Sequence, residues 1–214
     1  RLYDARKYEE AVASFDKAIE LKPKFVDVWS SRGDALLRLK KYEEAIASYD
    51  KAIELKPKNA DAWMNKGITF HYLKKQDDAI ASYDKAIEID PKNADTWNYK
   101  GNALYYLSRY DDAIASYDKA TEIDPKKAVA WSNKGQALLD LKKYEEAIAS
   151  IDKAVEIDPK NAFAWRRKAF ALRKLERYDD AMVCYDKAIQ IDPKNAVVWK
   201  GIRKTLKKLG SPEY

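Results

Sequence analysis

The side chains that most often carry enzyme chemistry are scarce in this sequence. His71 is the only histidine and Cys184 is the only cysteine. A histidine-based catalytic triad would have to be built around His71, and a zinc site needs several Cys or His ligands at defined spacing. The sequence also lacks a glycine-rich phosphate-binding loop and a nucleophile elbow. We therefore predict that the protein is not an enzyme and that it holds no metal and no other cofactor.

Simpler roles are open to His71 and Cys184. A lone histidine can make a binding groove sensitive to pH, but it is more often an ordinary contact residue. Cys184 takes the place of a serine that recurs elsewhere in the sequence, so we expect no redox role for it. A single cysteine cannot form an internal disulfide, which is compatible with a reducing compartment. We expect the protein to be cytoplasmic.

Carboxylates are plentiful, but they follow a fixed period. One aspartate recurs every 34 residues and is followed each time by a lysine; these aspartates are Asp16, Asp50, Asp84, Asp118, Asp152 and Asp186. A residue that recurs in every unit serves the unit more readily than it serves a single active site. We therefore expect these carboxylates to lie on a solvated outer face.

The same interval of 34 residues spaces the tryptophans and six of the seven prolines. The tryptophans are Trp29, Trp63, Trp97, Trp131, Trp165 and Trp199. A constant interval in this range is typical of repeat proteins, in which each unit is one supersecondary element. The sequence predicts a partial repeat at 1–25, mainly its second helix, complete repeats at 26–59, 60–93, 94–127, 128–161 and 162–195, and a capping helix with a tail at 196–214. We expect them to form one solenoid domain.

Each repeat has the pattern of two amphipathic helices. In 60–93, apolar and small residues recur at helical spacing in two segments that are separated near Lys74 and Gln76. Pro91 should end the second helix near Asp90, because proline removes a backbone donor and disfavours the α conformation of the preceding residue. Asn93 suits the N-cap of the next helix. The sequence thus predicts two helices per repeat.

Small and aromatic residues define how these helices should pack. A glycine in mid-helix costs about 1 kcal/mol relative to alanine. Its recurrence at Gly33, Gly67, Gly101 and Gly135 therefore implies close approach by a neighbouring helix. We expect the tryptophans to be core residues, because large aromatic side chains dominate core energetics.

The order of these residues resembles the tetratricopeptide repeat. In 94–127 the family pattern is met by Trp97, Gly101, Leu104, Ala113, Tyr117, Ala120 and Pro125. Three positions depart from the pattern of the other repeats: Ala169 replaces glycine, Ile151 replaces the aromatic residue and Lys127 replaces the asparagine cap. The resemblance implies an all-α, right-handed superhelical solenoid of antiparallel helix pairs, whose first helices line a concave groove. It also implies a protein-interaction scaffold that binds an extended peptide there.

Carried over by position, the groove residues that vary between repeats run from acidic, such as Asp34, to basic. The predicted peptide-binding residues are Asn65, Tyr72, Asn98, Tyr99, Asn102, Tyr106, Asn133, Arg166, Arg167 and Phe170. Asparagine can pair with a peptide backbone, and tyrosine supplies stiff contact area with a polar tip. Arginine forks recognise carboxylates, so Arg166 and Arg167 are expected to hold an acidic side chain or a free C-terminus.

Family members that bind chaperone tails use a five-residue carboxylate clamp. The resemblance places Asn102, Asn133 and Arg167 at three of its positions, but Asn98 and Phe163 stand where the clamp has lysine. We therefore predict a related carboxylate-reading groove and not the chaperone adaptor itself.

Two other functions remain open from the sequence. The chain starts in mid-repeat, so we expect it to be part of a longer array or to use its N-terminal helix for homo-oligomerisation. Single-stranded nucleic acid could stack on the groove tyrosines, but acidic groove residues would repel phosphates, and a net charge of +6 from 41 basic and 35 acidic residues is mixed in sign. No apolar run approaches the roughly 18 residues that a membrane span needs, so no membrane partner is expected.

Overall fold

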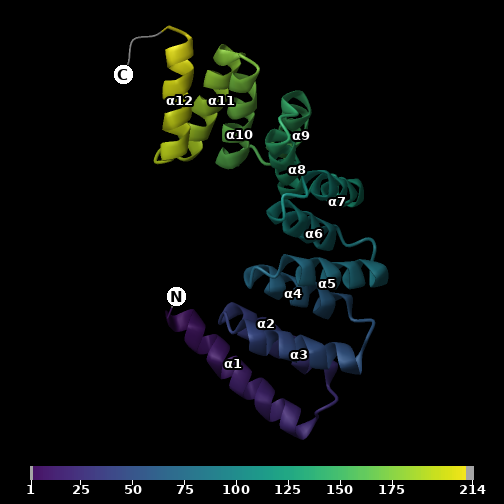
Figure 1. Cartoon of the computed structure of the whole chain (residues 1–214). Coiled ribbons are helices and arrows are strands. Elements are labelled where there is room, and N and C mark those ends of the chain that lie inside the picture. The colour runs from purple at the N-terminus through teal and green to yellow at the C-terminus, as the bar shows by residue number, and fades with distance from the viewer. Residues whose placement is uncertain (1, 211–214) are drawn as a thin grey trace. The chain divides into compact units, whose positions relative to one another are not determined.

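The computed structural model describes residues 2–210, with side chains described from Ala5 onward. Within this range all regular elements are α-helices and there is no strand (Figure 1). The helices are α1 Leu2–Leu21, α2 Val26–Arg38, α3 Tyr42–Leu55, α4 Ala60–Tyr72, α5 Gln76–Ile89, α6 Ala94–Tyr106, α7 Tyr110–Ile123, α8 Ala128–Asp140, α9 Tyr144–Ile157, α10 Ala162–Lys174, α11 Tyr178–Ile191 and α12 Ala196–Lys208. The all-α repeat prediction is confirmed. The predicted tail at 211–214 lies outside the described residues.

The chain divides into two compact units, one ending at Leu107 and the other beginning at Ser108. The first unit holds α1 to α6, and each helix from α1 to α5 packs on the next helix in sequence. The second unit, α7 to α12, repeats this order. First helices of neighbouring repeats also touch within a unit, as α2 touches α4 and α8 touches α10. This is the neighbour-only packing of a helical solenoid.

Helix ends follow the local sequence signals. The break predicted near Lys74 and Gln76 is the turn between α4 and α5, where Lys74 takes a left-handed φ of 61°. Asn93 caps α6 as predicted, because its side chain accepts a hydrogen bond of 3.1 Å from the backbone N–H of Thr96. Lys127, which replaces this asparagine before α8, makes no side-chain cap.

The deepest core is built from glycine facing an aromatic ring. Tyr49, Tyr83, Tyr117 and Tyr185 on the second helices are at most 2% exposed, and Ile151 takes the same place in α9. A Cβ added to Gly67 would lie 2.6 Å from Cε1 of Tyr83 in the same repeat. The predicted close approach of a neighbouring helix is thus confirmed, and its partner is the repeat's own second helix.

The tryptophans are structural, but not as the buried core residues that we expected. None is fully buried, and Trp199 is 46% exposed. Each indole Nε1 donates a hydrogen bond of 2.9–3.2 Å to the carbonyl oxygen of the proline six residues earlier. The shared period of tryptophan and proline therefore reflects a side-chain bond that holds the linker between repeats against the next first helix.

The N-terminal helix differs from the sequence prediction. By the 34-residue period, residues 1–6 align with the end of a first helix and Tyr8–Leu21 with a complete second helix. Instead α1 is continuous over Leu2–Leu21. Arg6 stands where the other repeats have the left-handed turn residue, such as Lys40 with φ 61°. A left-handed residue costs about 1–2 kcal/mol, and the continuous helix avoids this cost.

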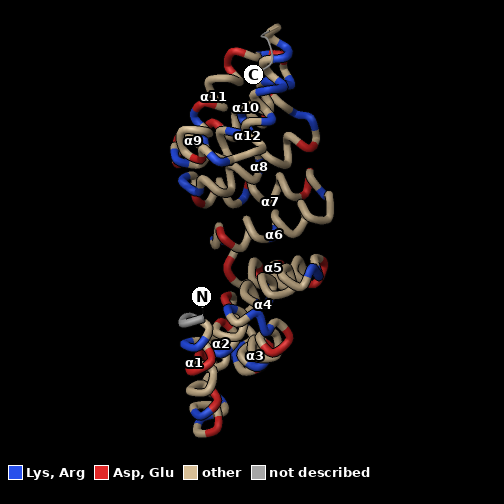
Figure 2. The backbone as a smooth tube through the Cα atoms, turned by 90° about the vertical axis from the view of Figure 1, so that its left-hand side faces the viewer, with Lys and Arg blue, Asp and Glu red and all other residues tan. Residues whose placement is uncertain are grey.

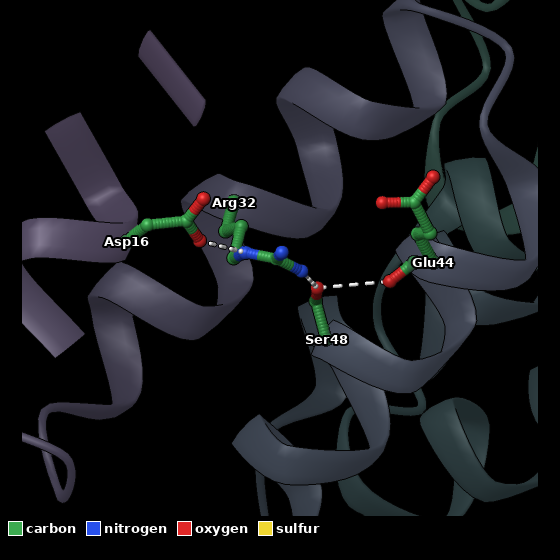
Figure 3. A network of polar contacts seen from close by, with 4 residues as sticks. All are labelled: Asp16, Arg32, Glu44 and Ser48. Carbon is green, nitrogen blue, oxygen red and sulfur yellow. Dashed lines mark hydrogen bonds and ion pairs between the residues drawn. The ribbon is translucent and has the colours of Figure 1, made fainter. Parts of the chain in front are cut away.

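The periodic aspartates also do more than solvate an outer face. Asp16, on α1, accepts a hydrogen bond of 2.7 Å from Nε of Arg32 on α2, while Nη1 of Arg32 donates to Oγ of Ser48 on α3 at 2.7 Å (Figure 3). The equivalent pairs Lys66–Asp50, Lys100–Asp84, Lys134–Asp118 and Lys168–Asp152 measure 2.5–2.6 Å. These half-exposed ion pairs join consecutive repeats. Elsewhere acidic and basic residues are interspersed along each unit (Figure 2).

Candidate peptide-binding pockets

Each unit contains a pocket beside the first helices that were predicted to bind peptide. In the first unit a hollow of about 530 Å³ lies between α2, α3 and α4, and we call it the Asp34 pocket. Its lining residues are Asp34, Leu37, Arg38, Lys40, Tyr42, Met64, Asn65, Ile68, Tyr72 and Tyr99. In the second unit a hollow of about 320 Å³ lies between α8, α9 and α10, and we call it the Arg166 pocket. Its lining residues are Gln136, Leu139, Asp140, Lys142, Tyr144, Arg166, Arg167, Phe170 and Lys174.

The two pockets are the same place in the repeat. Every residue that lines the Arg166 pocket lies three repeats after a residue that lines the Asp34 pocket. The two pockets are therefore formed by equivalent parts of the backbone, and they differ in the side chains that line them. In the Arg166 pocket, Gln136 occupies the position of Asp34, Arg166 that of Met64 and Lys174 that of Tyr72.

Asp34 forms the polar floor of its pocket. Its Oδ1 accepts hydrogen bonds from the Tyr49 hydroxyl at 2.7 Å and from Nδ2 of Asn65 at 2.9 Å. Desolvation raises the pKa of the Asp34 carboxyl, and the two hydrogen bonds only partly offset this effect. Desolvation and the neighbouring Asp34 charge also raise the pKa of the Tyr49 hydroxyl, which stays protonated and acts as a donor.

Aromatic rings form one wall of the Asp34 pocket. The Tyr42 and Tyr72 rings are stacked, with centroids 5.8 Å apart and an interplanar angle of 7°. Tyr72 remains 59% exposed. Tyr99 stacks on the buried ring of Tyr83 at 6.1 Å. The pocket thus combines a carboxylate floor with a tyrosine wall that a ligand can reach.

The Arg166 pocket is strongly basic. Phe170 lies under two cations: the Arg173 guanidinium is 5.3 Å and the Lys174 ammonium 5.7 Å from its ring centroid. Among the described residues, no carboxylate forms an ion pair with Arg166, Arg173 or Lys174. The acid of the pocket, Asp140, accepts a hydrogen bond of 2.9 Å from Gln136.

Arg167 makes a bond within the protein that the sequence did not suggest. Its Nη1 donates to Oγ of Ser132 at 2.7 Å and to the Ser132 carbonyl oxygen at 3.2 Å. The side chain therefore ties α10 to α8. Arg167 still lines the pocket, but one of its guanidinium nitrogens is engaged by Ser132. Arg166 is therefore the arginine better placed to bind a ligand.

The predicted binding residues are thus divided among several places. Asn65, Tyr72 and Tyr99 line the Asp34 pocket, whereas Arg166, Arg167 and Phe170 line the Arg166 pocket. Asn102 on α6 and Asn133 on α8 are partly buried and line neither pocket.

Asn98 is only 4% exposed, which leaves little of its side chain for a peptide. Its counterpart Ser132 is 3% exposed, so the side chain at this position is covered in these two repeats, whereas Met64 and Arg166 at the same position line pockets. Tyr106 is 67% exposed and lies edge-on to the His71 ring at 5.0 Å. His71 Nδ1 lies 2.8 Å from Oε1 of Gln76, an ordinary contact between α4 and α5.

Some lining residues were missed because they come from the turn and the second helix. Tyr42 and Tyr144 begin second helices, and Lys40 and Lys142 occupy the turns before them. Tyrosine recurs at this position in most repeats, so its periodicity marked it as scaffold. The signal that could have identified this tyrosine is its position at the start of the second helix, directly after the turn that follows the first helix.

Two searches of the described residues, 2–210, bear on other functions. Within this range no group of three or more His, Cys, Asp or Glu side chains is arranged to hold a metal ion. Over the same range, none of the helices has the length and apolar character needed to cross a bilayer.

Comparison with solved structures finds other repeat proteins. YrrB, described as a tetratricopeptide repeat protein with an unusual peptide-binding site, has 25% sequence identity and a TM-score of 0.73, over 87% of this chain and 96% of YrrB. PilF of Pseudomonas aeruginosa has 24% identity and a TM-score of 0.74, over 95% of this chain and 86% of PilF. MamA of Desulfovibrio magneticus RS-1 has 19% identity and a TM-score of 0.73, over 80% of this chain and 97% of MamA. The last two similarities concern the fold alone.

Family models supply the assignment. A search of curated proteins found no match. Models described as tetratricopeptide repeat match residues 1–60 and 100–162, residues 60–93 and 162–195, and residues 82–115. The first of these models alone covers more than half of the chain, and together they leave only the segment after residue 195 unmatched. The chain therefore belongs to the tetratricopeptide repeat family.

Proposed function

We propose that this protein is an interaction scaffold that binds an extended peptide along its first helices, with an acidic side chain or free C-terminal carboxylate of the peptide in the Arg166 pocket. The family and its structural relatives support the scaffold itself. The anionic specificity is argued from the charges of the pocket.

The carrying observation is the group of cations around Phe170 for which the described part of the chain supplies no carboxylate partner. Arg173 and Lys174 share one aromatic ring, and Arg166 lines the same pocket. Like charges held around one ring repel each other, and an anion placed among them relieves that repulsion. A carboxylate can also accept two parallel hydrogen bonds from a guanidinium. Arg166 and Lys174 would contact the ligand, and Arg167 would position α10 through Ser132.

The test compares a pentapeptide that ends in aspartate with a free carboxylate against its amidated twin, by calorimetric titration of the full chain. We expect the peptide with the free carboxylate to bind more tightly than its amidated twin. Arg166→Gln should lower the affinity for the free carboxylate about tenfold, because a hydrogen bond between charged groups is stronger than one between neutral groups. Lys200→Gln makes the same charge change on exposed α12 and should leave binding unchanged. Equal affinity for the two peptides, or normal binding by Arg166→Gln, would contradict the proposal.

Self-assembly is a second candidate, and one feature of α1 favours it. The described apolar side chains of α1 are at best half-buried, whereas Ala45, Tyr49 and Ala52 of α3 are fully buried. Leu21, at the end of α1, is 83% exposed. A second copy of the chain could cover this face, and the two functions are compatible.

A further inference from the structure

The floor of the Asp34 pocket offers hydrogen-bond acceptors to a ligand. Asn65 uses Nδ2 and Tyr49 uses its hydroxyl proton to bond the same atom, Oδ1 of Asp34. These bonds fix the orientation of both donors. Among the described residues, Oδ2 of Asp34 and Oδ1 of Asn65 accept no hydrogen bond. A ligand that enters the pocket therefore meets one anionic and one neutral acceptor, and it must supply the donors.

The wall of the Asp34 pocket suits a flat cation with an apolar stem. Tyr72 is held parallel to Tyr42 and keeps more than half of its surface open. An exposed tyrosine face attracts a guanidinium by the cation–π interaction, and arginine stacks there more readily than lysine because it is planar and weakly hydrated. Met64 and Ile68, which also line the pocket, would cover the methylene stem.

Two basic residues of the chain stand at the rim of the pocket. Arg38 ends α2 and Lys40 lies in the turn after it, and both are exposed. The charge of Arg38 lowers the pKa of Asp34, so it acts on the carboxyl, but it forms no ion pair with it. The negative charge of Asp61 has the opposite effect on that pKa. Arg38 should therefore compete with a cationic ligand by repulsion, without blocking the carboxylate.

The equivalent pocket differs at the three positions that would bind the cation. Gln136 replaces the carboxylate, Arg166 replaces Met64, and Lys174 replaces the exposed Tyr72. We propose that the Asp34 pocket is a binding site for a cationic peptide side chain, arginine before lysine. This proposal rests on the proposed function only in assuming a peptide ligand. Equivalent pockets in the two units would then bind side chains of opposite charge.

The experiment titrates the full chain with the acetylated, amidated tripeptide Gly-Arg-Gly and follows backbone amides by two-dimensional NMR. We expect saturable shifts of residues near Asp34 and Asn65, and weaker binding of the matching Gly-Gln-Gly peptide. Asp34→Asn keeps an oxygen for Tyr49 and Asn65 but removes the charge, so it should weaken arginine binding about threefold to fivefold, as expected for a half-exposed ion pair. Arg38→Gln should strengthen binding about twofold by removing the competing charge.

Controls keep this proposal separate from the carboxylate proposal. The free-carboxylate peptide should bind Asp34→Asn as it binds the unaltered chain, which also shows that the variant is folded. Asp140→Asn, in the equivalent pocket, should leave arginine binding unchanged. The proposed site is refuted if the glutamine peptide binds as tightly as the arginine peptide, if Asp34→Asn binds the arginine peptide normally, or if no saturation is reached by about 10 mM.

Discussion

At the scale of single residues, one position can carry opposite chemistry in different repeats. Asp34 and Gln136 stand at the same place on α2 and α8, yet only Asp34 supplies a charge to its pocket. Desolvation acts in the same direction on two titratable groups. Burial raises the pKa of Asp34 and also raises the pKa of the Cys184 thiol to about 11. The cysteine is 4% exposed and stays protonated near neutral pH.

The raised pKa of Asp34 predicts a pH-dependent effect on stability. A carboxyl whose pKa is higher in the folded state stabilises the fold only while it is protonated, and that contribution is lost as the pH rises through the folded pKa. Asp34→Asn should therefore be more stable than the unaltered chain near pH 7. Its advantage should shrink as the pH falls below the pKa of Asp34, because the native carboxyl then also becomes neutral.

Urea denaturation at neutral and acidic pH measures this difference. Glu9→Gln, which removes a carboxylate from exposed α1, provides the comparison for a general loss of negative charge. A stability gain for Asp34→Asn that grows toward acidic pH would show that the sign is wrong.

At the scale of helix pairs, the contact between glycine and tyrosine sets how closely α4 and α5 approach. Gly67→Ala would gain about 1 kcal/mol in helix propensity, but the new Cβ would lie 2.6 Å from the Tyr83 ring. Overpacking of this kind costs about 1–3 kcal/mol. We therefore expect a net destabilisation of about 1 kcal/mol, measured by urea denaturation.

Repeat 162–195 provides a natural comparison for this contact. Ala169 occupies the glycine position there and is fully buried, so its surroundings already accept a Cβ. Ala169→Gly should lose about 1 kcal/mol through helix propensity alone. Greater stability of Gly67→Ala than of the unaltered chain would mean that the ring moves aside without penalty.

At the scale of the whole molecule, each unit is held together by neighbouring repeats only. Inter-repeat ion pairs and the bonds from tryptophan to the proline linker recur at each junction that has the residues for them. Among the described residues α1 packs on α2 alone, so part of its apolar face is open to another chain.

Self-association through α1 should appear in the mass of the protein. We expect sedimentation equilibrium to show a mass that increases with concentration. Val12→Glu, on the half-buried side of α1 that packs against the buried cluster around Leu36 and Tyr49, should abolish that increase, whereas Glu9→Lys on the exposed side should not. A constant monomer mass over the full concentration range would rule out this role.

Much of the fold was predictable because it depends on local signals. Proline, the asparagine caps and the periodic glycines set the helix ends and the close contacts, and the structure agrees with them. The course of α1 was not predictable by alignment, because the helix continues through Arg6, where the other repeats have a left-handed turn residue. The hydrogen bonds from tryptophan to the linkers were not predictable either, because a shared sequence spacing relates two residues without showing which of their atoms are in contact.

The candidate pockets divide in the same way. The sequence by itself determined that the repeat is helical, which first-helix positions vary, and that their charge changes from acidic to basic along the chain. Only the tertiary structure decided that Asn98 is buried, that Arg167 is bonded to Ser132, and that Asp34 keeps an acceptor for a ligand. The physical reason is that periodicity specifies the face of a helix, whereas the free capacity of a side chain depends on the neighbours that helix packing brings to it.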